Sequence, residues 1–161
     1  MASEKLRLKL DWGALAVIAV LAASVAGQLA TASHLAWYAR LAKPSFTPPD
    51  WVFGPVWGAL YLLMAFAVWR VVKLRASPAR AVALALFFLQ LTLNAAWSWM
   101  FFGAHSPLLG LLNIIPQFLL IVAALIAFLR LDGPAGLAMA PLAAWVGFAV
   151  ALNAAIWQLN G

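Results

Sequence analysis

Residues 50–70 read D-W-V-F-G-P-V-W-G-A-L-Y-L-L-M-A-F-A-V-W-R, and the nineteen residues from Trp51 to Trp69 carry no formal charge. An uncharged apolar run of this length, closed by a basic residue, predicts a membrane-spanning helix. Aromatic residues that anchor such a helix in the membrane interface belong at its ends. Trp57, however, lies about two turns inside the run, and Tyr61 lies one turn deeper on the same helical face. This placement predicts a lining for a flat, apolar ligand.

The whole chain has the composition of a membrane protein. Of its 161 residues, 67% are hydrophobic and 9% are charged, and the mean hydropathy is +1.01; soluble domains carry about 25% charged residues. All fourteen charged residues lie outside five apolar runs, each long enough to cross a hydrocarbon core of about 30 Å. These runs predict one all-α transmembrane domain over residues 1–161, a bundle of five helices at about 11–33, 50–72, 79–103, 107–130 and 134–158.

The basic residues are divided unequally between the two sides of the predicted bundle. Only Arg40 and Lys43 fall on the side opposite the N-terminus. The other eight fall on the N-terminal side: Lys5, Arg7, Lys9, Arg70, Lys73, Arg75, Arg80 and Arg130. The positive-inside rule therefore predicts a multi-pass protein with a cytoplasmic N-terminus and an external C-terminus. Because the basic residues separate the spans, the net charge of +6 does not indicate nucleic-acid binding.

The connection from His34 to Asp50 is the longest and contains three prolines within six residues. Proline restricts the backbone, so an ordered, non-helical course is expected. We expect three aromatic residues of this loop to pack onto the bundle: Trp37, Tyr38 and Phe46. The loop is predicted to be either a lid or an interfacial spacer. The remaining connections are short, which predicts antiparallel neighbouring helices.

Two later runs place polar and aromatic side chains on one helical face each. In the third run these residues are Gln90, Asn94, Trp97 and Phe101. In the fifth they are Trp145, Phe148, Ala149, Leu152 and Asn153. Asn94 and Asn153 are too polar to face lipid and are expected to point into the bundle. Together with Trp57 and Tyr61 they predict an indole-walled pocket for a large apolar ligand, although each asparagine taken singly is equally well explained as a bridge between helices.

The other tryptophans have a simpler interpretation. Six lie near the ends of predicted spans and are expected to be interfacial anchors: Trp12, Trp37, Trp51, Trp69, Trp99 and Trp157. Trp145 differs because it falls near the middle of its run, where an indole N–H needs a partner. Its position favours a side chain that faces the bundle.

The sequence offers no groups for acid–base, metal or thiol chemistry. It contains no cysteine, and no Asp, Glu, Lys, Arg or His falls within an apolar run, so a proton relay or a buried general acid is not expected. His34 and His105 lie in separate loops, two helices apart along the chain, and neither has a carboxylate at the spacing of a metal site or a triad. We therefore expect no metal site and no acid–base catalytic residue.

Three stretches of the chain resemble a known family. They are W-Y-A-R-L-A-K-P-S-F-T-P-P-D-W-V-F-G-P-V-W-G-A-L-Y-L-L-M (residues 37–64), Q-L-T-L-N-A-A-W-S-W-M-F-F-G (90–103) and P-L-A-A-W-V-G-F-A-V-A-L-N-A-A-I-W (141–157). Their order and spacing resemble the TspO/MBR family, also called translocator proteins, tryptophan-rich sensory proteins or peripheral-type benzodiazepine receptors. The resemblance covers nearly the whole chain, and the composition rich in alanine and leucine suits a bacterial member in the cell membrane.

The resemblance implies a homodimeric five-helix bundle in the lipid bilayer, without a covalent cofactor. It implies binding of protoporphyrin IX or haem, and of synthetic isoquinoline and benzodiazepine ligands, beneath the first loop. The implied function is that of a sensor or regulator of porphyrin flux and stress response. The alternatives are transport of porphyrins or other apolar small molecules, and light-dependent degradation of protoporphyrin. The implied binding positions are Gly27, Phe46, Trp57, Tyr61, Asn94, Trp97, Trp145, Phe148, Ala149 and Leu152.

The alternative of light-dependent degradation gives Trp57 and Trp145 a catalytic part, and no other catalytic residue is implied.

The chain departs from the family in two places. Many members have Trp where this chain has Phe46. A proposed sterol-binding pattern needs Tyr followed by Lys or Arg, and A-L-N-A-A-I-W-Q-L-N-G (residues 151–161) has neither. The resemblance therefore gives no support for sterol binding.

The predicted topology can be tested by labelling, because the chain has no native cysteine. Single cysteines at Ser3 and Asn160 should react with a membrane-impermeant thiol reagent from opposite sides, with residue 3 on the cytoplasmic side. Labelling of both positions from the same side would contradict the five spans. Labelling from opposite sides in the reversed sense would contradict only the orientation.

Overall fold

The structure of the protein, a computed structural model, describes residues 11–161. Ser3, Lys5, Arg7 and Lys9, on which part of the predicted orientation and its test rest, lie outside the described residues. Within these residues, five helices are long and apolar enough to span a bilayer. They are α1 (Trp12–Ala32), α3 (Asp50–Lys73), α4 (Pro78–Ser98) with its π-helical continuation η1 (Trp99–Gly103), α5 (Pro107–Leu131) and α6 (Gly133–Asn160). The predicted all-α, five-helix membrane architecture is confirmed.

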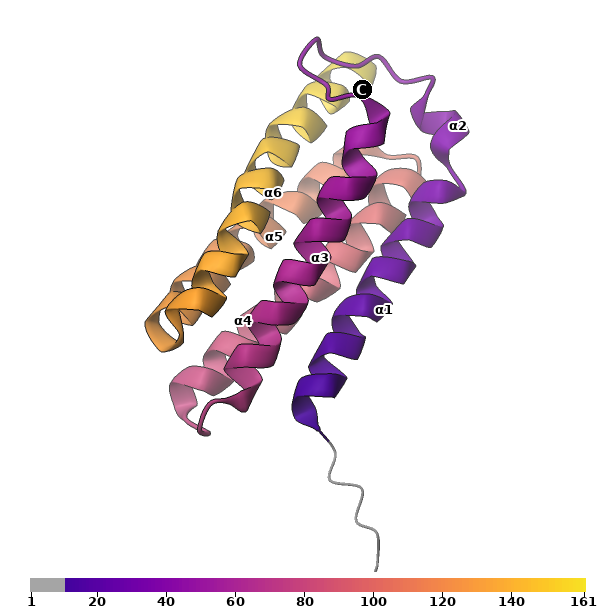
Figure 1. Ribbon diagram of the computed structural model, residues 1–161. Helices are drawn as coiled ribbons and strands as arrows, with labels where there is room; N and C mark the ends of the chain where they lie inside the picture. The colour runs from indigo at the N-terminus through magenta and orange to yellow at the C-terminus, as the bar shows by residue number, and fades with distance from the viewer. Residues whose placement is uncertain (1–10) are drawn as a thin grey trace, which may run out of the picture.

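The long helices form an antiparallel bundle (Figure 1). Helix α3 lies between α1 and α6 on one side of the bundle and contacts both, and α4 and α5 lie behind it. The short helix α2 (Leu35–Tyr38) and the loop that follows it cross one end of the bundle, close to the C-terminus. The helix expected over residues 79–103 is not α-helical throughout, because its backbone changes from α-helical to π-helical at Trp99. Such widened turns occur often at functional sites.

Short polar side chains fix where most of the long helices begin. An N-cap side chain accepts a hydrogen bond from the backbone N–H of the first turn in four helices. The caps are Asp11 for α1, Ser77 for α4, Ser106 for α5 and Asp132 for α6. Helix α3 instead follows Pro49 and carries Asp50 in its first turn, where a negative charge is favoured by the helix dipole. The spans therefore end at residues that water can solvate.

Ion pairs join the helices at the end of the bundle opposite the loop. Arg70 of α3 donates from Nε to Oδ1 of Asp132 and from Nη2 to Oδ2, each at 2.8 Å. The hydrogen bonds from Arg70 and from the Ala135 N–H hold the pKa of Asp132 below its ordinary value. Lys73 pairs with Asp11 at 2.8 Å and, by that hydrogen bond, lowers the pKa of Asp11. These contacts join α3 to the start of α1 and to the junction of α5 and α6.

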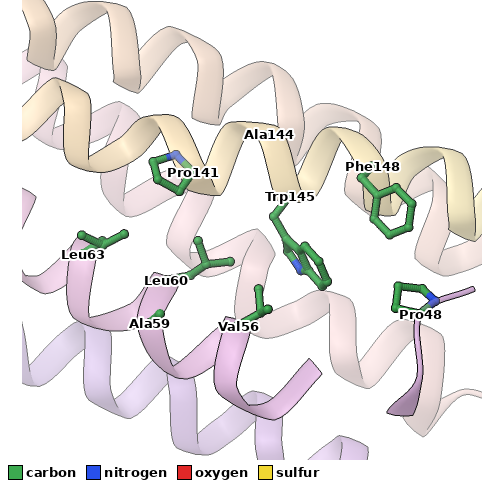
Figure 2. Close-up of a pocket in the computed structure, with 9 residues that line it drawn as sticks. All are labelled: Pro48, Val56, Ala59, Leu60, Leu63, Pro141, Ala144, Trp145 and Phe148. Carbon is green, nitrogen blue, oxygen red and sulfur yellow. The ribbon is translucent and has the colours of Figure 1, made fainter. Parts of the chain in front are cut away.

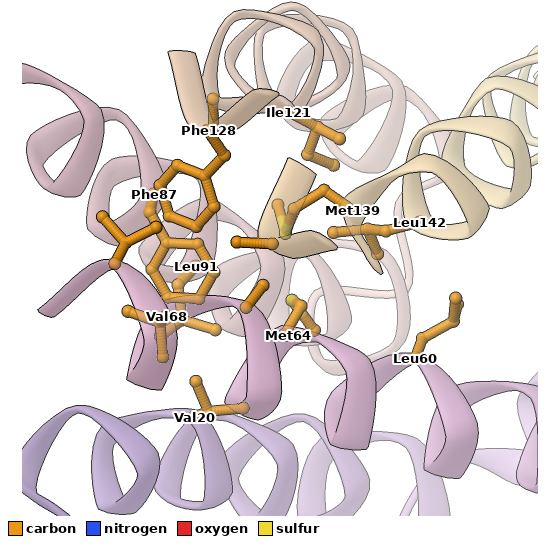
Figure 3. Packing of buried hydrophobic residues seen from close by; sticks show 14 of the residues in the cluster. Val20, Leu60, Met64, Val68, Phe87, Leu91, Ile121, Phe128, Met139 and Leu142 are labelled. Carbon is orange, nitrogen blue, oxygen red and sulfur yellow. The ribbon is translucent and has the colours of Figure 1, made fainter. Parts of the chain in front are cut away.

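The interior of the bundle is filled by large apolar side chains from all five long helices (Figure 3). Phe87 of α4 stacks on Phe128 of α5, with ring centroids 5.6 Å apart and planes inclined by 16°. Met64 and Val68 of α3 are fully buried beside them. Because lipid is as apolar as these side chains, close packing, not exclusion from water, holds the helices together.

Glycine permits the closest approach between two helices. A Cβ atom added at Gly136 of α6 would lie 2.5 Å from the backbone nitrogen of Leu129 in α5. Real Cβ atoms do not come so close to backbone, so the tight α5–α6 hairpin requires glycine at this position. Gly58 of α3, by contrast, has nothing within 4 Å of an added Cβ.

All three aromatic residues of the loop after α1 contact the bundle, as expected, and Phe46 does so through Phe148 of α6. Trp37 contacts Phe101 edge-on at 5.6 Å, and Tyr38 contacts Phe102 at 5.5 Å between ring centroids. Burial raises the pKa of Tyr38 to about 12. Phe46, however, remains 51% exposed. The loop is therefore an ordered cover whose middle part is less closely packed than its start.

A second attachment holds this loop to the end of α6. The backbone N–H of Ala42 donates to Oδ1 of Asn160, and Nδ2 of Asn160 donates to the Ala42 carbonyl, both at 2.9 Å. One side-chain amide therefore satisfies a backbone donor and acceptor that have no secondary-structure partner. The C-terminal helix takes part in positioning the cover over the bundle.

Gly136→Ala should destabilise the bundle by about 1–3 kcal/mol, the usual cost of overpacking, because the backbone of Leu129 cannot move aside cheaply. Gly58→Ala, the same change at an open position of α3, should leave stability unchanged or slightly raised. Thermal unfolding in detergent, followed by helical circular dichroism, measures both. A Gly136→Ala protein that unfolds at the parental temperature would contradict the close α5–α6 approach.

Candidate ligand-binding site

A groove with a volume of about 590 Å³ lies between α3 and α6 (Figure 2). Pro48 of the loop lies at one end of it, and Trp145 projects from α6 towards α3. The helical residues of the lining are Val56, Ala59, Leu60 and Leu63 of α3 and Pro141, Ala144, Trp145 and Phe148 of α6. This volume is within the range of about 300–1,000 Å³ that is typical of small-molecule sites.

The groove exists because small residues occupy the facing helices where larger ones would close it. Ala59 and Ala144 contribute only a methyl group each to the lining. The α3 residues recur at i, i+3, i+4 and i+7, so they form one continuous face of that helix. The indole N–H of Trp145 is the only polar side-chain group among the lining residues. The groove suits a ligand that is largely apolar.

Aromatic rings surround Trp145. Its ring centroid lies 5.8 Å from that of Phe53 on α3, at an interplanar angle of 72°, and 5.7 Å from that of Phe148. Phe148 in turn contacts Phe46 of the loop edge-on at 6.2 Å. Edge-to-face and tilted contacts of this kind are favourable. They hold the indole in place and leave it available for stacking with a planar ligand.

Trp57 lies on α3 with a second cluster, directed towards α1 and α4. Its ring is 5.7 Å from that of Tyr61, whose hydroxyl donates to Oδ1 of Asn94 at 2.6 Å. A Cβ added at Gly27 of α1 would lie 3.8 Å from the Tyr61 hydroxyl oxygen and 3.3 Å from Oγ of Ser98. Gly27 therefore lets α1 pack closely on Ser98 beside the Tyr61–Asn94 pair, and a methyl group there would crowd Ser98. Trp57 is not among the residues that line the groove.

Asn94 and Asn153 both point into the bundle, as expected, with exposed fractions of 4% and 2%. Asn153 accepts from Nε1 of Trp97 at 3.1 Å and donates to the Pro107 carbonyl at 2.8 Å. It therefore bridges α4, α5 and α6. The Nδ2 atom of Asn94 has no hydrogen-bond partner among the described residues. Both asparagines bridge helices, since Asn94 of α4 accepts from Tyr61 of α3, and Asn94 also keeps one donor without a partner among these residues.

The ten expected binding positions thus fall into separate groups. Trp145 and Phe148 line the groove, Phe46 touches its rim, and Ala149 packs half-buried on the core. Gly27, Tyr61 and Asn94 form the second cluster beside Trp57. Trp97 stacks on Phe101, with centroids 5.0 Å apart, and Leu152 is buried against Phe101. That Trp57 and Trp145 flank one ligand stays a prediction.

Most of the groove-lining residues were not singled out from the sequence. They are Pro48, Val56, Ala59, Leu60, Leu63, Pro141 and Ala144. Apolar residues at helical spacing occur on every face of a membrane span, so no pattern separates the groove from the core or from lipid-facing surface. The sequence does place a small residue, Ala144, next to the mid-span Trp145. This pattern does not show which helix lies opposite.

Comparison with known proteins gives concordant matches. The sequence profile of the TspO/MBR family matches residues 14–158. The tryptophan-rich protein TspO of Chlorobaculum tepidum is 42% identical over 149 residues, which are 91% of this chain and 94% of the relative. The translocator protein of Homo sapiens is 38% identical, covering 78% and 76% of the two chains. The tryptophan-rich sensory protein of Cereibacter sphaeroides is 37% identical, covering 77% of each.

Proposed function

Because the chain belongs to the TspO/MBR family, we propose that it binds a tetrapyrrole such as protoporphyrin IX or haem and acts as a sensor or regulator of porphyrin flux and stress response. The observation that carries this proposal is the apolar α3–α6 groove of about 590 Å³ with Trp145 in its wall. Relatives named as translocator and sensory proteins support a role in sensing or transport.

The chemistry of the groove suits a flat macrocycle. Such a ligand buries a large apolar area against Leu60, Leu63 and Phe148, and each aromatic pair adds about 0.5–1.5 kcal/mol beyond the buried area. The polar edge of a tetrapyrrole requires water or a cation. Among the lining side chains only the indole N–H of Trp145 is polar, so we place that edge outside the groove. Synthetic isoquinoline and benzodiazepine ligands, which are also planar and apolar, suit the same surface.

The proposal also covers the membrane in which the protein lies, its orientation and its oligomeric state. The family resemblance and the composition rich in alanine and leucine place the chain in a bacterial cell membrane, and the resemblance also suggests a homodimer. The distribution of basic residues places the N-terminus in the cytoplasm. The small residues Ala81 and Ala85 of α4 are suited to close helix contact. They can serve either a second copy or packing within one bundle.

Transport is the second candidate, favoured by the name of the human relative. Flux of a labelled porphyrin into liposomes that contain the protein separates transport from binding alone.

Degradation is a third candidate, in which the bound porphyrin absorbs light and oriented indoles take part. Absorbance of the complex followed in light and in darkness tests it. Loss of the porphyrin band only in light, and only with intact Trp57 and Trp145, would support degradation.

Trp57→Phe and Trp145→Phe should each weaken protoporphyrin binding about tenfold, equivalent to about 1.4 kcal/mol. Trp145 lines the groove, and the family resemblance implies that Trp57, which lies outside its lining, contacts the same ligand. Trp12→Phe is the control, since Trp12 is 68% exposed at the start of α1 and is expected to be an anchor. Quenching of tryptophan fluorescence on titration with protoporphyrin measures the affinities. If both pocket variants bind as the parent does while retaining helicity, the site lies elsewhere.

Ala144→Leu should weaken protoporphyrin binding because the larger side chain fills the middle of the groove. Ala140→Leu makes the same chemical change at an exposed position of α6 that does not line the groove, and should bind as the parent. The absorbance of bound protoporphyrin, titrated in detergent, measures both. Equal binding by the two variants would exclude the groove even if the Trp57 variant binds poorly, and would direct attention to the Tyr61–Asn94 cluster.

A further inference from the structure

The two histidines of the chain lie against each other at the end of the bundle that carries the loop. His34 follows α1, His105 follows η1, and the centroids of their rings are 5.0 Å apart at an interplanar angle of 76°. These are the only histidines in the sequence. Their separation by two helices along the chain gives no reason to pair them. The fold brings them together because α1 and η1 are neighbours at this end.

A hydrogen bond determines which nitrogen of His34 is available. The Nδ1 atom lies 2.7 Å from the carbonyl oxygen of Ala30. A carbonyl can only accept, so Nδ1 carries the proton and donates, and Nε2 keeps its lone pair. Metal-binding histidines almost always have this arrangement, in which the second nitrogen donates to a carbonyl or carboxylate and orients the ring. His34 is therefore prepared as an Nε2 ligand.

His105 is exposed and is held by stacking on Trp37. The two ring centroids are 4.7 Å apart and the planes are inclined by 16°. The φ angle of His105 is +53°, in the left-handed region that non-glycine residues seldom adopt. This conformation presents the imidazole to Trp37 and His34 instead of to solvent alone. An exposed ring held only by stacking can turn towards a shared ligand at small cost.

We propose that His34 and His105 together bind one transition-metal ion of the Cu²⁺, Ni²⁺ or Zn²⁺ class, with water completing the coordination. Imidazole suits these ions, whereas Mg²⁺ and Ca²⁺ require oxygen ligands. Within residues 11–161 no group of three or more His, Cys, Asp or Glu side chains gathers, so the site has two protein ligands and remains open. It binds metal more weakly than a closed four-ligand structural site does.

The geometry predicts what binding does to the loop. Metal–nitrogen distances are about 2.0–2.1 Å, so both nitrogens must converge on one point. The ring of His34 is fixed by Ala30, and His105 is the one that turns, which breaks its stack with Trp37. The ion then joins the end of α1 directly to the connection between η1 and α5. Because Trp37 opens the segment that continues to Pro48 at the groove, metal binding changes how this cover is held.

The test uses the full-length protein without a polyhistidine tag. Titration calorimetry with ZnCl₂ should show one ion per chain, and the electron paramagnetic resonance spectrum of the Cu²⁺ form should show two imidazole nitrogens. His34→Asn and His105→Asn should each weaken Zn²⁺ binding at least tenfold. Both variants keep a polar side chain, and circular dichroism checks that they are folded.

Trp37→Phe is the matched control, because it keeps both imidazoles and an aromatic ring. It should bind Zn²⁺ as the parent does but lose most of the change in tryptophan fluorescence that accompanies binding. Parental affinity in either histidine variant, or a Cu²⁺ spectrum of the parent without nitrogen ligands, would overturn the proposal. The spectrum decides the question even if a histidine variant fails to fold. None of these readouts depends on porphyrin binding.

Discussion

The bilayer core contains no water that can satisfy a peptide group, and the rest of this structure depends on that constraint. Each backbone donor and acceptor that crosses the core must be paired within the same segment, so the chain crosses as helices. Short polar side chains that bond to the unpaired backbone groups of a first turn lie where four of the spans begin. There Asp11, Ser77, Ser106 and Asp132 cap the helices, and Arg70 and Lys73 bind two of these caps. Three of these caps, Asp11, Ser77 and Asp132, lie with the ion pairs at one end of the bundle, and Ser106 lies at the other end.

Within the bundle, the size of a few side chains decides where helices touch and where they separate. Gly136 lets α6 approach the backbone of α5 so closely that no Cβ fits. Ala59 of α3 and Ala144 of α6 both line the groove, where the space between the two helices is left open. At Gly136 the absent side chain lets Leu129 of α5 pack directly on α6, whereas at the groove the alanine methyl groups leave the space beside Trp145 and Phe148 unfilled.

The sequence predicts the helices well because length, charge and polarity act locally. The five spans and the burial of Asn94 and Asn153 follow from the cost of charges and amides in lipid. The rotation of each helix about its own axis depends on packing with neighbours that are distant in sequence. The periodic pattern of one helix therefore does not predict which neighbour each of its faces contacts. For this reason the sequence predicts that Trp57 lies beside Tyr61 but does not show that Trp145 lines the groove while Trp57 does not. For the same reason the contact between His34 and His105 was not foreseen.

The central claim is that the space between α3 and α6 holds the ligand, and the absence of native cysteine allows a direct test. Cysteines placed at Ala59 and Ala144 can be joined across the groove by a short, reducible bifunctional thiol reagent. The joined protein should lose protoporphyrin binding and regain it on reduction, while each single-cysteine protein treated in the same way should keep it. Unchanged affinity of the joined protein would contradict the assignment of the groove as the binding site.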